Sequence, residues 1–448
     1  MKRERFFLSV CRLAVPAALQ SMLQSSFGVV DQLMIGQMGS VEVAGIGLAA
    51  KFASMFSVLV SAVATVAGIM ISQYVGRRSA REVQSSFRVN LMLAMGIAAP
   101  FTMLCAGLPY GIMGLYTRDA AALAVAAEYL RIYAAAFLPA AGTAMLSTLF
   151  RCMDRASLPL WAGAVSMLSN TVLNYVLIFG HFGFAPMRIA GAAVASVVSQ
   201  CAGFLMLLPL YLRNRKRFFG GGEEGSERPV FRWVQYGAML LPVMICEFMW
   251  SLGENVYAGI YGRMGTAACA AMTLLNPVQG LTIGALSGLA QAAGIIVGKR
   301  LGAGDPSGAY EAAKKLIRYG FVSSLALSMA VVLLRSGYVA LYRIEESVRE
   351  LARRIMLAYA AVAPVKVLNM IVGGGVLRSG GRTEYVMAID LVGTWLFGVP
   401  LGLLMAFVFR RTIPWVYFML SLEECVRFAI SMVVLRRKKW MRRLSSEA

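Results

Sequence analysis

The chain has 448 residues, of which 59% are hydrophobic and only 15% are charged, and its formal net charge at pH 7 is +21. A soluble globular protein carries roughly 45–50% apolar and about 25% charged residues, so most of this chain is expected to lie in lipid. The composition argues against a soluble enzyme or a nucleic-acid-binding domain, because the basic residues lie in short segments between long apolar stretches.

Apolar stretches long enough to cross a bilayer recur along the whole chain. A membrane-spanning helix needs about 20 mostly apolar residues. The stretches here do not alternate as strands do, and they are rich in Ala, Leu, Met and Gly. The sequence therefore predicts an all-α membrane protein with twelve transmembrane helices, six in each half. They are expected near residues 13–35, 45–71, 89–110, 125–147, 158–180, 189–212, 234–260, 267–297, 316–340, 355–377, 385–409 and 413–435.

Lys and Arg gather on one side of this expected bilayer. With the N-terminus placed in the cytoplasm, most of the 43 Lys and Arg fall in cytoplasmic segments such as Lys2–Arg12, Arg77–Arg88 and Arg436–Arg443. This positive-inside asymmetry predicts that both termini are cytoplasmic. The basic N-terminus precedes a span-length apolar run that lacks a small-residue cleavage site. We therefore expect a retained first helix in a multi-pass protein of the plasma (inner) membrane.

The two halves share one pattern of glycines, prolines and arginines, offset by 226 or 227 residues. Matching positions include Pro16 and Pro242, Gly36 and Gly262, Gly39 and Gly265, and Arg151 and Arg378. The match indicates two copies of one fold unit. Each half holds an even number of helices, so the copies are expected to be parallel repeats that form two lobes around a central cavity. The expected domains are an N-terminal lobe (1–212), a Gly- and charge-rich cytoplasmic linker (213–232), and a C-terminal lobe with a basic tail (233–448).

Two glycine-rich loops, residues 76–82 and 302–307, occupy equivalent places in the two repeats. Such loops can cradle phosphate, but neither has the GxxxxGK[ST] spacing. The favoured interpretation is a glycine-ended helix followed by an N-capped connector, with Asp305 or Ser307 as the cap.

Motifs for catalysis or metal binding are not found in the sequence. The seven cysteines show no CxxC spacing, His181 is the single histidine, and no P-loop or GxSxG motif occurs. We therefore expect a protein that is not an enzyme and that needs no cofactor. No nucleic-acid partner is expected, because the basic residues follow membrane topology.

Carboxylates inside the predicted spans are the main functional candidates. An ionisable group in a membrane helix costs several kcal/mol unless it is paired or hydrated. Asp31 lies in the outer half of the first helix, and Glu247 and Glu254 lie seven residues apart in the seventh, so the two glutamates share a face. The alternatives are a helix-end carboxylate at Asp31 and a structural pair between a helix-seven glutamate and Lys366 or a neighbouring Arg.

Uncharged polar side chains recur at helical spacing in two predicted spans. Gln20 with Gln24, and Asn170 with Asn174, are each four residues apart, so each pair shares a face. Such pairs can line a cavity or form hydrogen bonds between helices.

Several motifs resemble those of the MATE (multidrug and toxic compound extrusion) transporters. The first predicted helix carries Pro16 and then VDQLMIGQMG (30–39), and the fifth carries NTVLNYVLIFG (170–180). The tenth is followed by LRSGGRT (377–383), and the eleventh has Trp395 before Pro400. The similarity covers essentially the whole chain.

The resemblance implies secondary active antiport, in which an organic, usually cationic, drug-like compound leaves as H⁺ or Na⁺ enters by alternating access. The expected partners are this small-molecule substrate and the lipid bilayer, and the chain is expected to act as a monomer. The alternative within transport is a flippase-like exporter of a lipid-linked or polyanionic substrate, which should have a cavity lined with several Arg.

The chain departs from the family pattern at three places. Asn174 stands where several relatives carry an Asp, and Arg382 stands where Na⁺-coupled relatives carry another. Asp390, further along the same helix, is a candidate replacement for the second. The family's helix-seven Glu aligns with Trp250, so the resemblance points to a face of that helix. It does not say whether Glu247 or Glu254 is the equivalent carboxylate.

The candidate residues form two groups. Those expected to couple ions and bind substrate are Asp31, Glu247, Glu254, Asn170 and Asn174. Those expected to line a cavity are Gln20, Gln24, Trp250, Tyr257, Lys366 and Asp390. The aromatic members would suit flat cations, although simple packing is their commoner role. A Na⁺ ion, if it is the coupling ion, would be expected near Glu247 and Glu254.

Overall fold

A computed structural model describes residues 3–219, 232–342 and 345–444. The described residues form helices and no strands, and eleven helical runs are long and apolar enough to cross a membrane. These runs are α1 (Arg3–Gly36), α2 (Ser40–Gly76), α3 (Ala80–Gly107), α5 (Ala120–Tyr133) with η1 (Ala134–Ala136) and α6 (Phe137–Cys152), α7 (Ser157–Phe179), α8 (Arg188–Phe219), α9 (Trp233–Arg263), α10 (Thr266–Gly302), α11 (Pro306–Ala340), α12 (Glu346–Asn369) with η2 (Met370–Leu377), and α13 (Thr383–Leu391) with η3 (Val392–Gly398), α14 (Val399–Leu403) and η4 (Leu404–Val408). Eleven of the twelve predicted spans are thus confirmed as continuous runs. A short helix, α4 (Pro109–Gly114), lies between α3 and α5.

The twelfth predicted span, residues 413–435, is divided. It forms α15 (Ile413–Ser421) and α16 (Glu423–Arg437), which are separated at Leu422. The carbonyl of Leu422 accepts hydrogen bonds from the N–H groups of Cys425 and Val426, so a new helix begins there. The first turn of a helix favours negative charge, and Glu423 and Glu424 supply it.

The internal repeat is visible in the helix bounds. The second helix of each repeat, α2 and α10, begins and ends 226 residues apart in the chain, at Ser40 and Thr266 and at Gly76 and Gly302. The connectors that follow are N-capped as predicted. Asp305 accepts a hydrogen bond of 2.8 Å from the N–H of Gly308 and caps α11. This bond and the Ser307 hydroxyl lower the pKa of the Asp305 carboxyl from its usual range.

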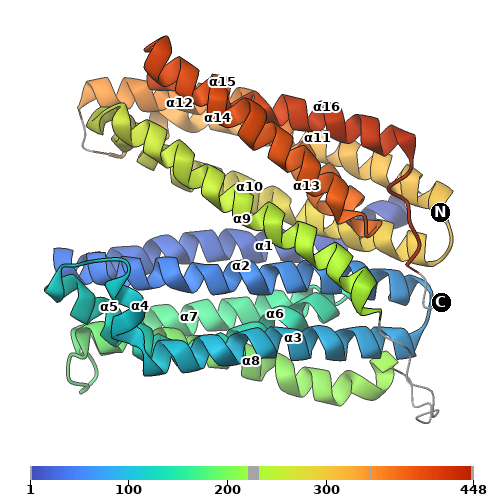
Figure 1. Cartoon of the computed structure of the whole chain (residues 1–448), viewed down its shortest axis with the longest axis horizontal. Coiled ribbons are helices and arrows are strands. Elements are labelled where there is room, and N and C mark those ends of the chain that lie inside the picture. Colours follow the sequence, from blue (N-terminus) through green and yellow to red (C-terminus); the bar gives the residue numbers. More distant parts are fainter. Residues whose placement is uncertain (1–2, 220–231, 343–344, 445–448) are drawn as a thin grey trace. The chain divides into compact units, whose positions relative to one another are not determined.

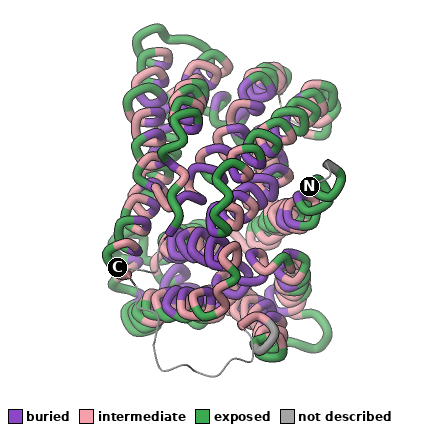
Figure 2. The backbone as a smooth tube through the Cα atoms, turned by 90° about the vertical axis from the view of Figure 1, so that its right-hand side faces the viewer, coloured by how far each residue is buried: buried purple, intermediate pink, exposed green. Residues whose placement is uncertain are grey.

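The chain divides into two compact units. The C-terminal unit comprises Met1–Ala18, Ser72–Arg78 and Arg232–Ala448, and the N-terminal unit comprises Leu19–Ile71 and Ser79–Phe231. Most of the predicted linker (213–232) lies outside the described residues, and the predicted lobe boundaries stay a prediction. In both units buried positions recur along the inner helix faces, whereas exposed positions lie on outer turns and loops (Figure 2).

The N-terminal unit is a bundle in which α8 has a central place. It packs against α5, α6 and α7, and α3 packs against α6. Small residues permit some of these close approaches. A Cβ atom on Gly191 of α8 would collide with the backbone of Leu177 in α7. The bundle therefore depends on glycine where α7 and α8 meet.

The C-terminal unit is built around α10 and α12 (Figure 1). The helix α10 packs against α11, α12 and η2, while α12 also contacts α15 and α16. The segment η2 is π-helical and contains three consecutive glycines. A Cβ atom on Gly375 would collide with the carbonyl of Ala290 in α10, so this wide helical segment lies directly against α10.

The ends of α2 and α10 cross at two glycines that are equivalent in the repeat. A Cβ atom on Gly76 would collide with the Lys299 carbonyl, and one on Gly302 would collide with the Gln73 carbonyl. Lys299 is the repeat equivalent of Gln73, so the contact is reciprocal. The duplicated glycines of the sequence therefore mark a close backbone crossing of α2 with α10.

The basic tail is tied to this crossing. Trp440 is fully buried, and its indole N–H donates to the Leu435 carbonyl at 3.2 Å. The side-chain amide of Gln73 donates to the Ser379 carbonyl at 2.7 Å and accepts from the N–H of Leu444 at 2.9 Å. One α2 side chain thus joins the tail to the segment after η2.

Candidate functional site

A carboxylate and two amides meet in the N-terminal unit. Asn174 donates a hydrogen bond of 2.5 Å to Asp31 and another of 3.2 Å to the side-chain oxygen of Asn170. Because Asn170 and Asn174 are four residues apart on α7, they share a face, and Asn170 also donates to the Ser196 hydroxyl of α8 at 3.5 Å. Asn174 is fully buried, and its side-chain oxygen has no hydrogen-bond partner among the described residues. The three predicted residues therefore form one cluster with a free oxygen beside the carboxylate.

Gln20 and Gln24, the predicted polar pair of α1, have different surroundings. Gln20 is half-buried and accepts a hydrogen bond of 2.9 Å from the Arg151 guanidinium. Gln24 is exposed. The structure thus gives Gln20 a role in holding the half-buried Arg151, which the spacing alone did not indicate.

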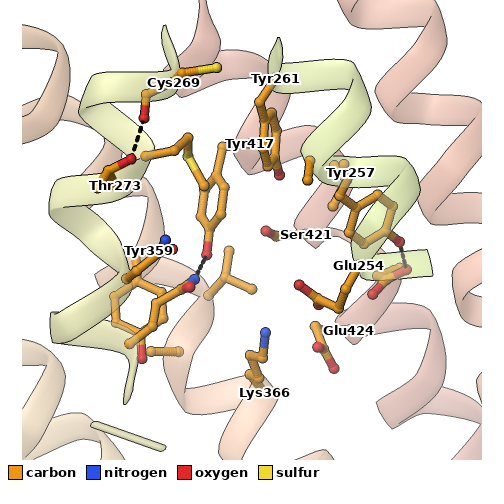
Figure 3. Close-up of a pocket in the computed structure, with 18 residues that line it drawn as sticks. Glu254, Tyr257, Tyr261, Cys269, Thr273, Tyr359, Lys366, Tyr417, Ser421 and Glu424 are labelled. Carbon is orange, nitrogen blue, oxygen red and sulfur yellow. Dashed lines mark hydrogen bonds between the residues drawn. The ribbon is translucent and has the colours of Figure 1, made fainter. Parts of the chain in front are cut away.

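The C-terminal unit contains an open cavity of about 330 Å³ (Figure 3). Its wall combines acidic residues, one Lys and several Tyr from α9, α10, α12, α15 and α16. Its polar and charged lining residues include Glu254, Tyr257, Tyr261, Asn276, Gln279, Tyr359, Lys366, Tyr417, Ser421, Glu423 and Glu424. With every carboxyl ionised, its lining is acidic overall, which favours a cation.

Helical periodicity explains the α9 wall of the cavity. Glu254, Tyr257 and Tyr261 are spaced by three and four residues, so they project from one face. Next to this wall, the break at Leu422 places Glu423 and Glu424 in the first turn of α16, and Glu423 contacts Tyr257. Carboxylates of two neighbouring helices therefore line one side of the cavity (Figure 3).

A buried ion-pair network supports the α16 carboxylates. Glu423 is 5% exposed, accepts a hydrogen bond from the Tyr257 hydroxyl, and lies 3.3 Å from the Arg427 guanidinium. Arg427 also contacts Asp390 at 3.9 Å and donates to the Thr394 hydroxyl. Burying these charges is tolerable because they compensate one another.

Asp390 belongs to this network and not to the cavity wall. Besides contacting Arg427, it accepts from the Cys246 thiol at 2.7 Å. It is absent from the residues that line the cavity of the described C-terminal unit. Trp250, another predicted lining residue, is also absent from that wall and is 53% exposed.

The two glutamates of α9 have different surroundings. Glu254 lines the cavity, whereas Glu247 lies 3.2 Å from the guanidinium of Arg378. The Arg378 side chain is 14% exposed and that of Glu247 25%, so the pair is largely shielded from solvent. The shared face predicted from the sequence therefore carries two distinct groups, and the alternative of a structural pair with a neighbouring Arg holds for Glu247.

Glu423, Glu424 and Arg427 are site residues that the sequence did not predict. The apolar run 413–435 contains these three charges within five residues, and that density in a predicted span was an available signal. No group of three or more His, Cys, Asp or Glu suited to a metal ion occurs in residues 3–219, 232–342 and 345–444.

Comparison with known proteins decides the family. The MatE family model matches residues 16–176 and 242–404, which are equivalent parts of the two repeats. The chain belongs to the MATE family. It is thus a multi-pass membrane protein of a transporter family, as the motifs predicted.

Curated MATE relatives match over most of their length. The chain is 28% identical to the Probable multidrug resistance protein NorM of Brucella suis over 414 residues, covering 89% of this chain and 86% of the relative. It is 23% identical to the protein of the same name from Thermotoga maritima, covering 96% and 92%. Both comparisons span the two repeats.

Solved MATE structures share the fold. The Vibrio cholerae MATE transporter VcmN in the bent form has a TM-score of 0.85 at 16% identity, covering 98% of this chain and 99% of that one. A MOP superfamily transporter from Pyrococcus furiosus has a TM-score of 0.82 at 16% identity, covering 97% and 96%. The all-helical, two-lobe MATE fold predicted from the sequence is thus confirmed.

Proposed function

We propose that this MATE protein is a secondary active antiporter that exports organic, cationic, drug-like compounds in exchange for H⁺ or Na⁺. The observation that carries the proposal is the acidic, tyrosine-rich cavity of the C-terminal unit. Carboxylates attract a cation, and aromatic faces add cation–π attraction. The name of the Brucella relative supports multidrug export as the family role.

Coupling requires that substrate and ion compete for the same negative charge. A bare carboxylate in a membrane protein costs several kcal/mol, so the site favours being occupied by a proton, a Na⁺ or the substrate. If the protein changes between its inward-facing and outward-facing states only when the site is occupied, outward transport of the substrate is tied to inward transport of the ion. Alternating access would then arise from rocking of the two repeats around a central cavity.

Two carboxylates are proposed to carry this exchange. Asp31 in the N-terminal unit has Asn174 and Asn170 as uncharged partners, so a proton or Na⁺ would meet no competing ion pair in that cluster. Glu254 in the C-terminal unit lines the cavity directly. We assign Glu247 to the pair with Arg378, and therefore place Na⁺, if it is the coupling ion, near Glu254.

The setting proposed for this transport follows from the charge distribution. Both termini are placed in the cytoplasm and the protein in the plasma (inner) membrane, because basic residues dominate the segments expected on that side. The protein is proposed to work as a monomer, with the bilayer and a small-molecule substrate as its partners. It is proposed to be no enzyme and to use no cofactor.

The rival proposal is a flippase-like exporter of a lipid-linked or polyanionic substrate. Such a cargo needs several basic side chains along its path. The described cavity carries Lys366 as its basic residue beside three glutamates. Its charge therefore favours a cationic substrate.

Transport by purified protein in liposomes tests the proposal. Proton and sodium gradients are imposed separately, and the export of ethidium and other organic cations is followed. We expect one gradient to drive export and its collapse to stop it. Export of polyanionic lipid headgroups with no response to organic cations would support the rival proposal instead.

A further inference from the structure

One basic side chain faces the carboxylates of the C-terminal cavity. Figure 3 shows Lys366 directed into the space that Glu254 and Glu424 also face. The three side chains come from α12, α9 and α16 respectively. A positive and a negative charge of the protein therefore share the volume in which a cation would bind.

Two of the three cavity carboxylates already have partners. Glu423 accepts from Tyr257 and pairs with Arg427 at 3.3 Å. Glu424 accepts a hydrogen bond of 2.8 Å from the side-chain amide of Asn369. These contacts fix both groups in the wall.

Lys366 and Glu254 differ from that pair. Within the part of the chain that the structure describes, neither side chain makes a hydrogen bond or an ion pair within 4.0 Å. Both line the same cavity of about 330 Å³. Lys366 and Glu254 are therefore the oppositely charged side chains of this wall that have no such partner.

The position of Lys366 favours movement of its ammonium group. It lies in the last turn of α12, directly before the π-helical segment η2. Wide π-helical turns occur frequently at functional sites. The Lys stem is flexible and its ammonium is a compact point charge, so it can approach a carboxylate or withdraw from it.

We propose that Lys366 is a tethered cation, which neutralises Glu254 when the cavity is empty and which an incoming organic cation must displace. This inference rests on the proposed export of cations. The tethered charge lowers the apparent affinity for a cationic substrate, because part of the binding free energy is used to separate Lys366 from Glu254. Lys366 is therefore a specificity-determining residue that acts through Glu254.

Ethidium binding to the purified protein tests the displacement. Lys366→Met removes the competitor and is expected to tighten ethidium binding about tenfold, which corresponds to about 1.4 kcal/mol. Lys366→Arg keeps the charge and should retain the weaker wild-type affinity. In a Glu254→Gln background, Lys366→Met should change affinity little, because the lysine acts through that carboxylate. Lys314→Met, at an exposed lysine paired with Glu311, is the matched control.

Thermal unfolding of the ligand-free protein tests the same pair without a ligand. Glu254→Gln should lower Tm by leaving the ammonium uncompensated, and adding Lys366→Met should restore part of the loss. If ethidium bound to none of the variants, the proposal that this cavity exports cations would be refuted. The Tm values of the four proteins would still show whether Lys366 and Glu254 interact. Unchanged or weaker ethidium binding by Lys366→Met, or strictly additive Tm shifts, would overturn the inference.

Discussion

Arg378 donates a hydrogen bond of 3.2 Å to Glu247, the carboxylate at the middle of α9. The repeat contains the same arrangement with different chemistry, since Arg151 donates to Gln20 at 2.9 Å. Gln20 and Glu247 are separated by the same 227 residues as the two arginines. A neutral amide thus satisfies the Arg in one repeat, and a carboxylate does so in the other.

Glu247→Gln should therefore be tolerated, because glutamine already fills this place opposite Arg151. We expect its Tm in detergent to stay close to that of the wild type. Arg378→Met should be far more damaging, since it leaves Glu247 without its counter-charge. Breaking a buried ion pair in this way costs about 3–5 kcal/mol, and the partial exposure of Glu247 places this pair at the low end. Equal loss of Tm in both variants would contradict the assignment.

The crossing of α2 with α10 should be sensitive to a single methyl group. Gly302→Ala places a Cβ atom on the Gln73 carbonyl, which is backbone and cannot move aside. Overpacking of this kind costs about 1–3 kcal/mol. Gly96→Ala is the matched control, because that α3 glycine has nothing within 4 Å of the added atom. Thermal unfolding should show a loss for Gly302→Ala and no loss for Gly96→Ala.

The Asp305 cap should contribute to stability only while the carboxylate is charged. Its hydrogen bonds with Gly308 and Ser307 lower its pKa from the usual 3.8. The contribution is present above the unfolded pKa and disappears as pH falls through the lower folded pKa. Asp305→Ala should cost about 0.5–2 kcal/mol near neutral pH. The Tm difference from wild type should shrink in acid, and a difference that grew in acid would contradict this.

Asp31→Asn should abolish ion-driven export while leaving the fold intact. The substitution removes the titratable group, but an amide can still bond Asn174, so Tm should change little. Ethidium efflux from liposomes under the driving gradient should fall to the level of protein-free liposomes. Asp119→Asn is the control, because Asp119 only caps α5 and an asparagine caps equally well. Wild-type efflux by Asp31→Asn would remove this residue from the coupling scheme.

Much of the fold was accessible from the sequence, because membrane helices are specified by local composition. The run 45–71 and its repeat 267–297 lie within α2 and α10, and the four-residue spacing of Asn170 and Asn174 correctly placed both on one face. The duplicated glycines also marked a real constraint, the crossing at Gly76 and Gly302.

Which side chains pair between different helices was harder to predict from the sequence. Periodicity placed Glu247 and Glu254 on one face, but only packing in three dimensions brings Arg378 to the first and opens a cavity at the second. The helix break at Leu422 is a single residue that keeps helical backbone angles. Apolar composition alone therefore predicted one continuous helix there.

The most direct measurement compares Glu254→Gln with Glu247→Gln in gradient-driven ethidium export from liposomes. The two variants make the same chemical change on one helix, seven residues apart, but Glu254 lines the cavity whereas Glu247 pairs with Arg378. We expect Glu254→Gln to lose its dependence on the ion gradient and Glu247→Gln to retain it. Loss of coupling in Glu247→Gln together with normal export by Glu254→Gln would contradict the assignment of ion coupling to the cavity of the C-terminal unit.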